Sequence, residues 1–164
     1  MKTTERQTMY DLTSVLEFDA LSEVRPGSSI LISGPAMSGK ERLAYDVLAD
    51  GMRNGDGAVV VTTGDGAGSV VEEFRSLVPD LDDSQLGVID CRGEGGTDEA
   101  AIGNAHAHHV SSPGDLTGIG IGITKALEGL HNAGNERGRL ALVSLSTMLT
   151  YTDKKTVFKF CHVL

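Results

Sequence analysis

The sequence predicts an α/β fold, with a mostly parallel sheet and helices on both of its faces. Short β-branched runs alternate with stretches of helical period, and Gly-rich turns separate them. Each helix returns the chain to the edge from which the next strand starts, so this alternation makes consecutive strands parallel. The 164-residue chain is 40% apolar, and a chain of this length buries roughly 70% of its unfolded surface in a single domain. We expect residues 1–26 to lead into a core formed by residues 27–164.

Four runs have the length and composition of strands. Residues 58–63 (AVVVTT) are the clearest, because a continuous β-branched run is typical of a strand buried on both faces of a parallel sheet. The other expected strands are residues 28–33 (SSILIS), 86–91 (LGVIDC) and 139–145 (RLALVSL). Ligands of such sheets bind at the carboxyl ends of the strands. The loops of interest are therefore residues 34–39, 64–68, 92–113 and 144–151.

Four stretches have the period of an amphipathic helix. In residues 39–52, for example, Leu43, Val47 and Met52 fall on one stripe. The other expected helices are residues 70–78, 115–131 and 154–164.

The stretch 115–131 fits two patterns. Isoleucine alternates with glycine over residues 118–123, as in a strand, but apolar residues also recur at helical spacing. Pro113 and Asp115 form a plausible helix start. We predict a helix, although each glycine in it costs roughly 1 kcal/mol relative to alanine.

The composition is acidic. The 14 Lys and Arg residues stand against 23 Asp and Glu residues, which gives a net charge of −9. Such a chain does not have the cationic surface that nucleic-acid binding requires, so we expect no nucleic-acid partner. The 13 Asp residues outnumber the 10 Glu residues and Lys occurs 6 times, which is typical of a halophilic surface kept soluble in high salt. Ordinary acidic cytosolic proteins share this bias.

Neither a membrane segment nor a disulfide framework is expected. No apolar run approaches the roughly 20 residues that span a bilayer, and the first residues lack a signal-peptide core. The two cysteines, Cys91 and Cys161, have no activating partner in the sequence, so we expect buried, inert thiols. These features together predict a cytoplasmic protein.

The pattern G-x-x-x-x-G-K lies between an expected strand and an expected helix. In such a loop, backbone N–H groups surround a phosphate, the helix N-terminus adds its positive end, and the lysine reaches the terminal phosphates. The alternative is a Gly-rich connector with a surface lysine. The expected phosphate-binding residues are Gly34, Pro35, Ala36, Met37, Ser38, Gly39, Lys40 and Glu41.

The block of residues 29–63 resembles the phosphate-loop region of KaiC-type ATPases in the RecA superfamily. Residues 111–123 and 143–151 are similar to the halophile branch of that superfamily, whose HTR-like members are related to the gas-vesicle regulator GvpD. The resemblance implies a RecA-like core that binds ATP or ADP as a homo-oligomer, either a dimer or a ring. It also implies a signalling protein as partner.

Several positions depart from the family's pattern. Glu41 replaces the Ser or Thr that holds Mg²⁺, and it either folds back to the metal or faces outward and stabilises the first helical turn. Val143 stands where the metal-orienting Asp ends a strand, which leaves Ser144 as the nearest polar candidate for the metal. Gly64 and Asp65 stand where KaiC-type enzymes have the Glu pair that activates water. Asp65 either orients a water or simply forms an Asp-Gly turn.

The resemblance further implies that the chain ends before the last strands of a RecA core. Our leading hypothesis is therefore a regulatory ATP- or ADP-binding protein with weak or no hydrolysis, in which Mg²⁺ is no longer held in the usual way. A second hypothesis is a slow ATPase in which Glu41 or Asp65 has replaced a lost catalytic group. A third is an interaction module with a vestigial loop, in which Glu41 pairs with Lys40 and fills the phosphate site.

Three histidines, His106, His108 and His109, are close enough in sequence to suggest a metal site. No cysteine lies near them at ligand spacing, and the nearest carboxylates are Asp98 and Glu99. We therefore favour a solvated loop before the turn at Pro113.

Overall fold

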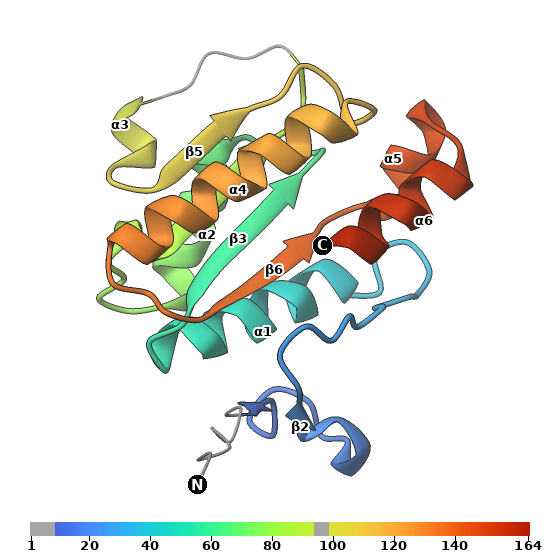
Figure 1. The fold of residues 1–164 in the computed structure, drawn as a ribbon. Helices are drawn as coiled ribbons and strands as arrows, with labels where there is room; N and C mark the ends of the chain where they lie inside the picture. The colour runs from blue at the N-terminus through green and yellow to red at the C-terminus, as the bar shows by residue number, and fades with distance from the viewer. Residues whose placement is uncertain (1–8, 94–98) are drawn as a thin grey trace, which may run out of the picture.

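The computed structural model describes residues 9–93 and 99–164 and has an α/β fold (Figure 1). Its main sheet has four strands, all parallel, in the order β5-β4-β3-β6. The strands are β3 (Gly57–Thr62), β4 (Leu86–Asp90), β5 (His106–His109) and β6 (Gly138–Leu142). In the central register Val60 pairs with Val88 on one side and with Ala141 on the other. The expected class and the parallel arrangement are confirmed.

Helices cover both faces of this sheet, as predicted. Helices α1 (Lys40–Arg53) and α2 (Ala67–Leu77) lie on one face, and the four-residue helix α3 (Glu99–Ile102) packs against α2. Helices α4 (Leu116–Asn132) and α6 (Lys154–Val163) lie on the other face, and the short α5 (Leu145–Tyr151) precedes α6. Two 3₁₀ turns, η1 (Asp19–Leu21) and η2 (Asp83–Gln85), lie in the connections. In the described part of the chain, no helix is both long and apolar enough to cross a membrane.

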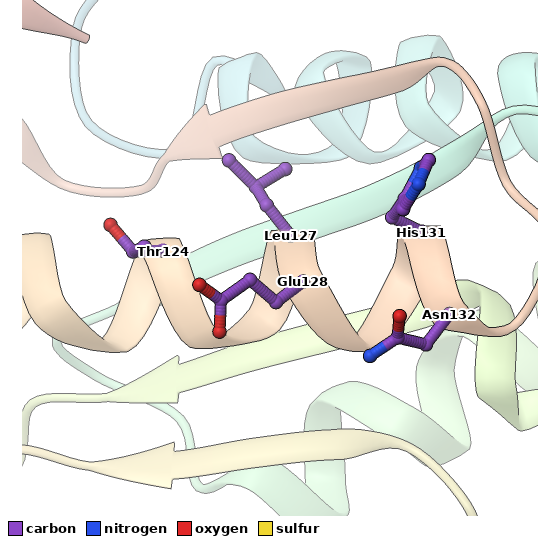
Figure 2. Close-up of a pocket in the computed structure, with 5 residues that line it drawn as sticks. All are labelled: Thr124, Leu127, Glu128, His131 and Asn132. Atoms are coloured by element: carbon purple, nitrogen blue, oxygen red, sulfur yellow. The ribbon is translucent and has the colours of Figure 1, made fainter.

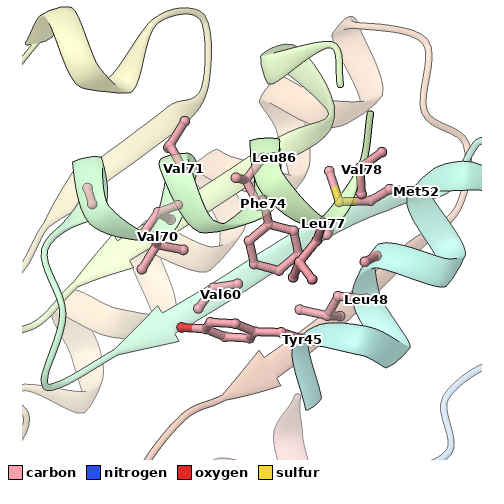
Figure 3. Packing of buried hydrophobic residues seen from close by; sticks show 14 of the residues in the cluster. Tyr45, Leu48, Met52, Val60, Val70, Val71, Phe74, Leu77, Val78 and Leu86 are labelled. Atoms are coloured by element: carbon pink, nitrogen blue, oxygen red, sulfur yellow. The ribbon is translucent and has the colours of Figure 1, made fainter. Parts of the chain in front are cut away.

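The core has two halves because successive side chains of a strand point to opposite faces. Val60 and Val88 pack with Tyr45 and Phe74 under α1 and α2 (Figure 3). The alternate residues, including Ile89, pack under α4 and α6. Every residue of β3 and β4 is buried, as the β-branched run of β3 predicts.

The stretch 115–131, whose pattern fits both a strand and a helix, corresponds to helix α4, and glycines of this helix have a packing role. A Cβ atom at Gly129 would collide with the His106 ring on β5. The absence of a Cβ at this position lets α4 lie close to β5, which offsets part of the low helix propensity of glycine.

The expected strand 28–33 is wrong: these residues form no strand, although they directly precede the phosphate-loop sequence. Ile30 is 42% exposed and Leu31 is 79% exposed. Among the residues that the structure describes, the one backbone hydrogen bond of Ser28 runs from its N–H to Arg25 O. A β-branched run becomes a strand only where it finds a partner strand and a face to bury, and in the described residues β6 is paired with β3 alone.

Two expected loops contain regular structure. The segment 92–113 includes α3 and β5, so the prediction of a solvated loop at the three histidines is wrong. The sequence did not predict this strand because three of its four residues are polar histidines. An edge strand such as β5 tolerates them, since its residues are at most partly buried. The segment 144–151 is mostly helix α5, and β6 ends at Leu142 rather than at residue 145.

The amino end of β6 carries a compact ionic cluster. Arg139 is 10% exposed at its side chain and forms ion pairs of 3.2 Å with both Asp50 and Asp56. It also donates to the carbonyl oxygen of Val47 at 2.7 Å. Ser14 donates to Asp50 at 2.6 Å, which ties the N-terminal segment to α1. The cluster therefore joins β6, α1 and the lead-in.

The lead-in forms a small antiparallel hairpin of β1 (Tyr10–Asp11) and β2 (Glu23–Val24). The ring of Tyr10 lies 4.0 Å from the Arg137 guanidinium carbon, in a cation–π contact. Leu12 and Leu16 are buried. This segment is thus packed onto the core rather than trailing from it.

Candidate functional site: the loop before α1

The phosphate-loop sequence lies at the carboxyl edge of the sheet. Helix α1 ends in a tight turn that leads directly into β3, so the N-terminus of α1 lies near the carboxyl end of β3. Residues 34–39 form an exposed bend at this end, and the helix starts at Lys40. The predicted helix context of the loop is confirmed, whereas its predicted supporting strand is absent.

Steric constraints explain why both positions of the motif are glycines. Gly39 has a φ of +82°, a left-handed conformation that L-residues with a Cβ adopt only with strain. A Cβ at Gly34 would lie 2.7 Å from the Ser38 hydroxyl oxygen. Met37 also has a positive φ, +60°, with its side chain fully exposed. Left-handed residues at 37 and 39 make the bend a tight one.

The bend leaves several backbone donors unused. In the described part of the chain, the N–H groups of Ala36, Met37 and Gly39 donate no hydrogen bond, and Ser38 N–H makes only a long one of 3.4 Å to Pro35 O. The Lys40 ammonium donates to the same Pro35 oxygen at 3.0 Å. One cation and a group of free N–H donors therefore share one small loop, at the positive end of a 14-residue helix. This is the chemistry that receives an oxyanion.

Glu41 faces away from the loop lysine. No ion pair joins it to Lys40 among the described residues, so the loop is not filled by its own acidic neighbour. Glu41 instead lines a hollow of about 350 Å³ between α1 and α2, which we call the α1–α2 hollow. The hollow is lined by Glu41, Arg42, Tyr45, Asp65, Ser69, Val70 and Glu73.

Asp65 belongs to the same hollow and is fixed by its backbone. The buried Thr62 hydroxyl donates to Asp65 O and accepts from Asp65 N, both at 3.0 Å. These two bonds close a turn that leaves the carboxylate exposed. The structure thus brings Glu41 and Asp65, which are 24 residues apart, to one surface.

Val143 and Ser144 directly follow the carboxyl end of β6, and neither carries a carboxylate. Val143 is 8% exposed and packs in the core. Ser144 has a φ of +65° and its hydroxyl lies 2.6 Å from that of Thr147, so it stabilises the start of α5. Ser144 therefore has a local partner, and the strand end offers no charged ligand for a metal.

An ion pair between a buried carboxylate and a partly exposed arginine lies at the end of β4 and was not predicted from the sequence. Asp90 is 3% exposed, pairs with Arg92 at 2.9 Å and accepts from the first N–H of α2, at Ala67. Burial opposes its ionisation, but the hydrogen bonds from Arg92 and Ala67 outweigh burial and hold the pKa of Asp90 below its usual value. The available signal was a charged residue at the end of an apolar run.

Comparison with family profiles shows to which family the chain belongs. The profile of a family of unknown function, DUF7504, matches residues 27–164. The chain belongs to this family. Searches of curated proteins and of solved structures found no match. The family's description names no activity, so functional inference depends on the geometry of the chain itself.

The three histidines do not share one face of β5. His106 and His108 lie on the face of β5 that packs against α4, and His106 Nε2 lies 3.1 Å from Ser84 O in η2. His109 points to the other face, and its Nε2 lies 3.3 Å from Gly93 O. Burial, followed by the charges of Lys125 and His106, lowers the pKa of His108. Among the described residues, no group of three His, Cys, Asp or Glu is arranged to hold a metal ion.

The two thiols differ in burial. Cys91 is fully buried, and burial raises its pKa to about 12. Cys161 is only partly buried, so the expectation of a buried thiol fails there. Burial also raises the pKa of Cys161. Neither thiol has the lowered pKa of a reactive cysteine.

A wider hollow of about 520 Å³ lies on the outer face of α4 (Figure 2). It is lined by Thr124, Leu127, Glu128, His131 and Asn132. These residues belong to the C-terminal half of α4, toward the amino ends of the parallel strands. The hollow is therefore separate from the candidate loop.

Proposed function

We propose that this protein is a regulatory nucleotide-binding protein with a RecA-like core. Its loop of residues 34–40 holds the phosphates of ATP or ADP. The observation that supports this most is the conjunction of free N–H donors at Ala36, Met37 and Gly39 with the Lys40 ammonium, at the N-terminus of α1. An anion there gains charge-assisted hydrogen bonds without breaking any helix bond.

In the free protein, the Lys40 ammonium bonds to Pro35 O. On binding, a phosphate takes the place of this neutral oxygen. Because the ammonium then faces a charged acceptor, the new bond is about twice as strong as a neutral one. The exchange of the Pro35 carbonyl for a phosphate oxygen therefore favours the bound state.

Weak or absent hydrolysis is part of the proposal. Val143 supplies no carboxylate at the end of β6, and Ser144 is engaged with Thr147. Glu41 offers a hard oxygen of the type that Mg²⁺ prefers, but it faces the α1–α2 hollow rather than the loop. A protein that binds nucleotide and turns it over slowly suits a regulatory role, and the HTR-like resemblance of residues 111–123 suggests a signalling protein as its partner.

One observation favours the slow-ATPase alternative. Asp65 and Glu41 line the same hollow next to the loop, where a water oriented by Asp65 would lie near bound phosphates. Phosphate release that is abolished by both Lys40→Ala and Asp65→Asn would support this alternative. No turnover above background in the purified protein would refute it.

The proposal is tested by titrating the protein with ATP and with ADP, with and without Mg²⁺. Lys40→Ala is expected to weaken binding at least tenfold, since it removes one hydrogen bond to a charged group. The matched control is Lys155→Ala, which removes the same charge from an exposed position on α6 and is expected to bind like the wild type. Equal affinity in the wild type and Lys40→Ala, or no binding by the wild type, would refute nucleotide binding at this loop.

A further inference from the structure

The α1–α2 hollow contains an unsatisfied polar atom. Tyr45 is 5% exposed, and within residues 9–93 and 99–164 its hydroxyl has no partner at 3.5 Å or less. The ring packs on Phe74, at 5.1 Å between centroids, and the hydroxyl points away from the core toward the connection between β3 and α2 (Figure 3). A buried hydroxyl without a partner costs about 1–3 kcal/mol. Because Tyr45 lines the hollow, its hydroxyl oxygen is available to a ligand that enters there.

The surroundings of this hydroxyl are acidic. Burial raises the pKa of Tyr45, the charges of Glu41, Asp65 and Glu73 raise it further, and so does the approach of the Glu41 carboxylate to the hydroxyl. All three carboxylates line the hollow, against one cation, Arg42. The ligand that fits this surface is therefore a cation.

Arg42 shows how this surface binds cations. Its guanidinium contacts Asp46 at 3.0 Å and Glu73 at 3.7 Å. It therefore neutralises part of the charge at the rim. No ion pair in the described part of the chain engages Glu41 or Asp65. Two carboxylates without a cation, Glu41 and Asp65, thus lie at the hollow with the Tyr45 hydroxyl, whose oxygen can still accept a hydrogen bond while its O–H is directed at Glu41.

The spacing of these groups favours an organic cation over a bare metal ion. Within the described residues, no three carboxylate or imidazole groups converge on one point. A guanidinium or a primary ammonium carries several N–H donors that reach separated acceptors, whereas a metal ion needs convergent oxygens. We infer that the α1–α2 hollow is a binding site for the guanidinium or ammonium head of an organic cation, which donates to Glu41, Asp65 and the Tyr45 hydroxyl.

The site is tested in nucleotide-free protein by calorimetric titration with agmatine, with an amidated Gly-Arg-Gly peptide and with MgCl₂. Agmatine represents a free small molecule, and the peptide represents a side chain of a protein partner. Binding of either organic cation at one site supports the inference, and the tighter of the two identifies the source. Binding of Mg²⁺ alone, or of none of the three, would overturn it.

Tyr45→Phe keeps the ring and removes only the hydroxyl. The variant is expected to bind the organic cation about tenfold more weakly, the loss of one hydrogen bond to a charged group. Tyr151→Phe, at an exposed tyrosine outside the hollow, is the matched control and is expected to bind like the wild type. Wild-type affinity in Tyr45→Phe would overturn the inference.

Two further measurements separate this site from folding and from the phosphate loop. Without ligand, Tyr45→Phe is expected to unfold at the same or higher urea concentration than the wild type, because it removes an unsatisfied group. A lower midpoint would show that the hydroxyl already has an internal partner, and would overturn the inference. Lys40→Ala should keep full affinity for the organic cation even if nucleotide binding is lost, and loss of cation binding there would place the cation in the loop instead.

Discussion

The two ends of β6 lie at opposite edges of the sheet and differ in how their polar groups are satisfied. At the amino end, Arg139 is buried and bonded to Asp50, Asp56 and a backbone carbonyl. At the carboxyl edge, free N–H groups, left-handed residues and an unpartnered tyrosine hydroxyl cluster around the N-terminus of α1. Saturated polar groups hold a fold together, and unsaturated ones are available to a ligand. We therefore expect the amino edge to contribute to stability and the carboxyl edge to bind a ligand.

The largest effect is expected at the amino edge. Arg139→Ala leaves Asp50 without its cation and Asp56 with only the longer 3.7 Å pair to Arg137, and breaking a buried pair in this way costs about 3–5 kcal/mol. The free energy of unfolding, measured with urea, should fall by this amount. Arg42→Ala, which breaks an exposed ion pair on α1, should change it by less than about 1 kcal/mol. Similar losses in both variants would contradict the assignment of stability to this cluster.

A smaller effect is expected at the loop. Gly39→Ala forces a Cβ into a left-handed conformation, which costs about 1–2 kcal/mol, and it should also weaken nucleotide binding by reshaping the bend. Gly64→Ala is the matched control, because its φ is not positive and a Cβ there meets open space. Unfolding and nucleotide titrations of both variants check this. A Gly39→Ala variant as stable as Gly64→Ala would show that the bend differs from the one described.

The smallest effect is a pH dependence at the end of β4. The pKa of Asp90 is lowered in the folded state, so its contribution to stability is present above the unfolded pKa of about 3.9 and is lost as the pH falls through the folded value. In Asp90→Asn this component of the acid dependence should disappear. Urea unfolding of both proteins between neutral pH and pH 3 measures it. Parallel pH profiles would show that Asp90 is not held ionised by Arg92.

The elements that could be read from the sequence are those whose pattern and burial agree. The run AVVVTT is β3, and the apolar stripe after Lys40 is α1. Residues 28–33 have an equally good strand pattern, but strand formation depends on a neighbouring strand that no local pattern specifies. At β5 the opposite error arose, because His106 and His108 are polar yet pack under α4.

The candidate site could be predicted in part. The pattern G-x-x-x-x-G-K locates the bend and the lysine, since both glycines have local steric roles. It did not show that Glu41, Tyr45 and Asp65 line one hollow, because that depends on how α2 packs against α1. Tyr45 in particular reads as a core residue, and only the three-dimensional arrangement shows that its hydroxyl lacks a partner.

The central claim, that the bend before α1 receives a polyphosphate, is tested most directly by the backbone amide resonances of the bend. Titration with ATP should shift the amide signals of Ala36, Met37, Gly39 and Lys40 by more than any signal from the amino edge of the sheet. At a nucleotide concentration near the wild-type Kd, the shifts of Ala36, Met37 and Gly39 should be several-fold smaller in Lys40→Ala. Unchanged signals in the bend at saturating ATP, or shifts confined to another surface, would contradict the account.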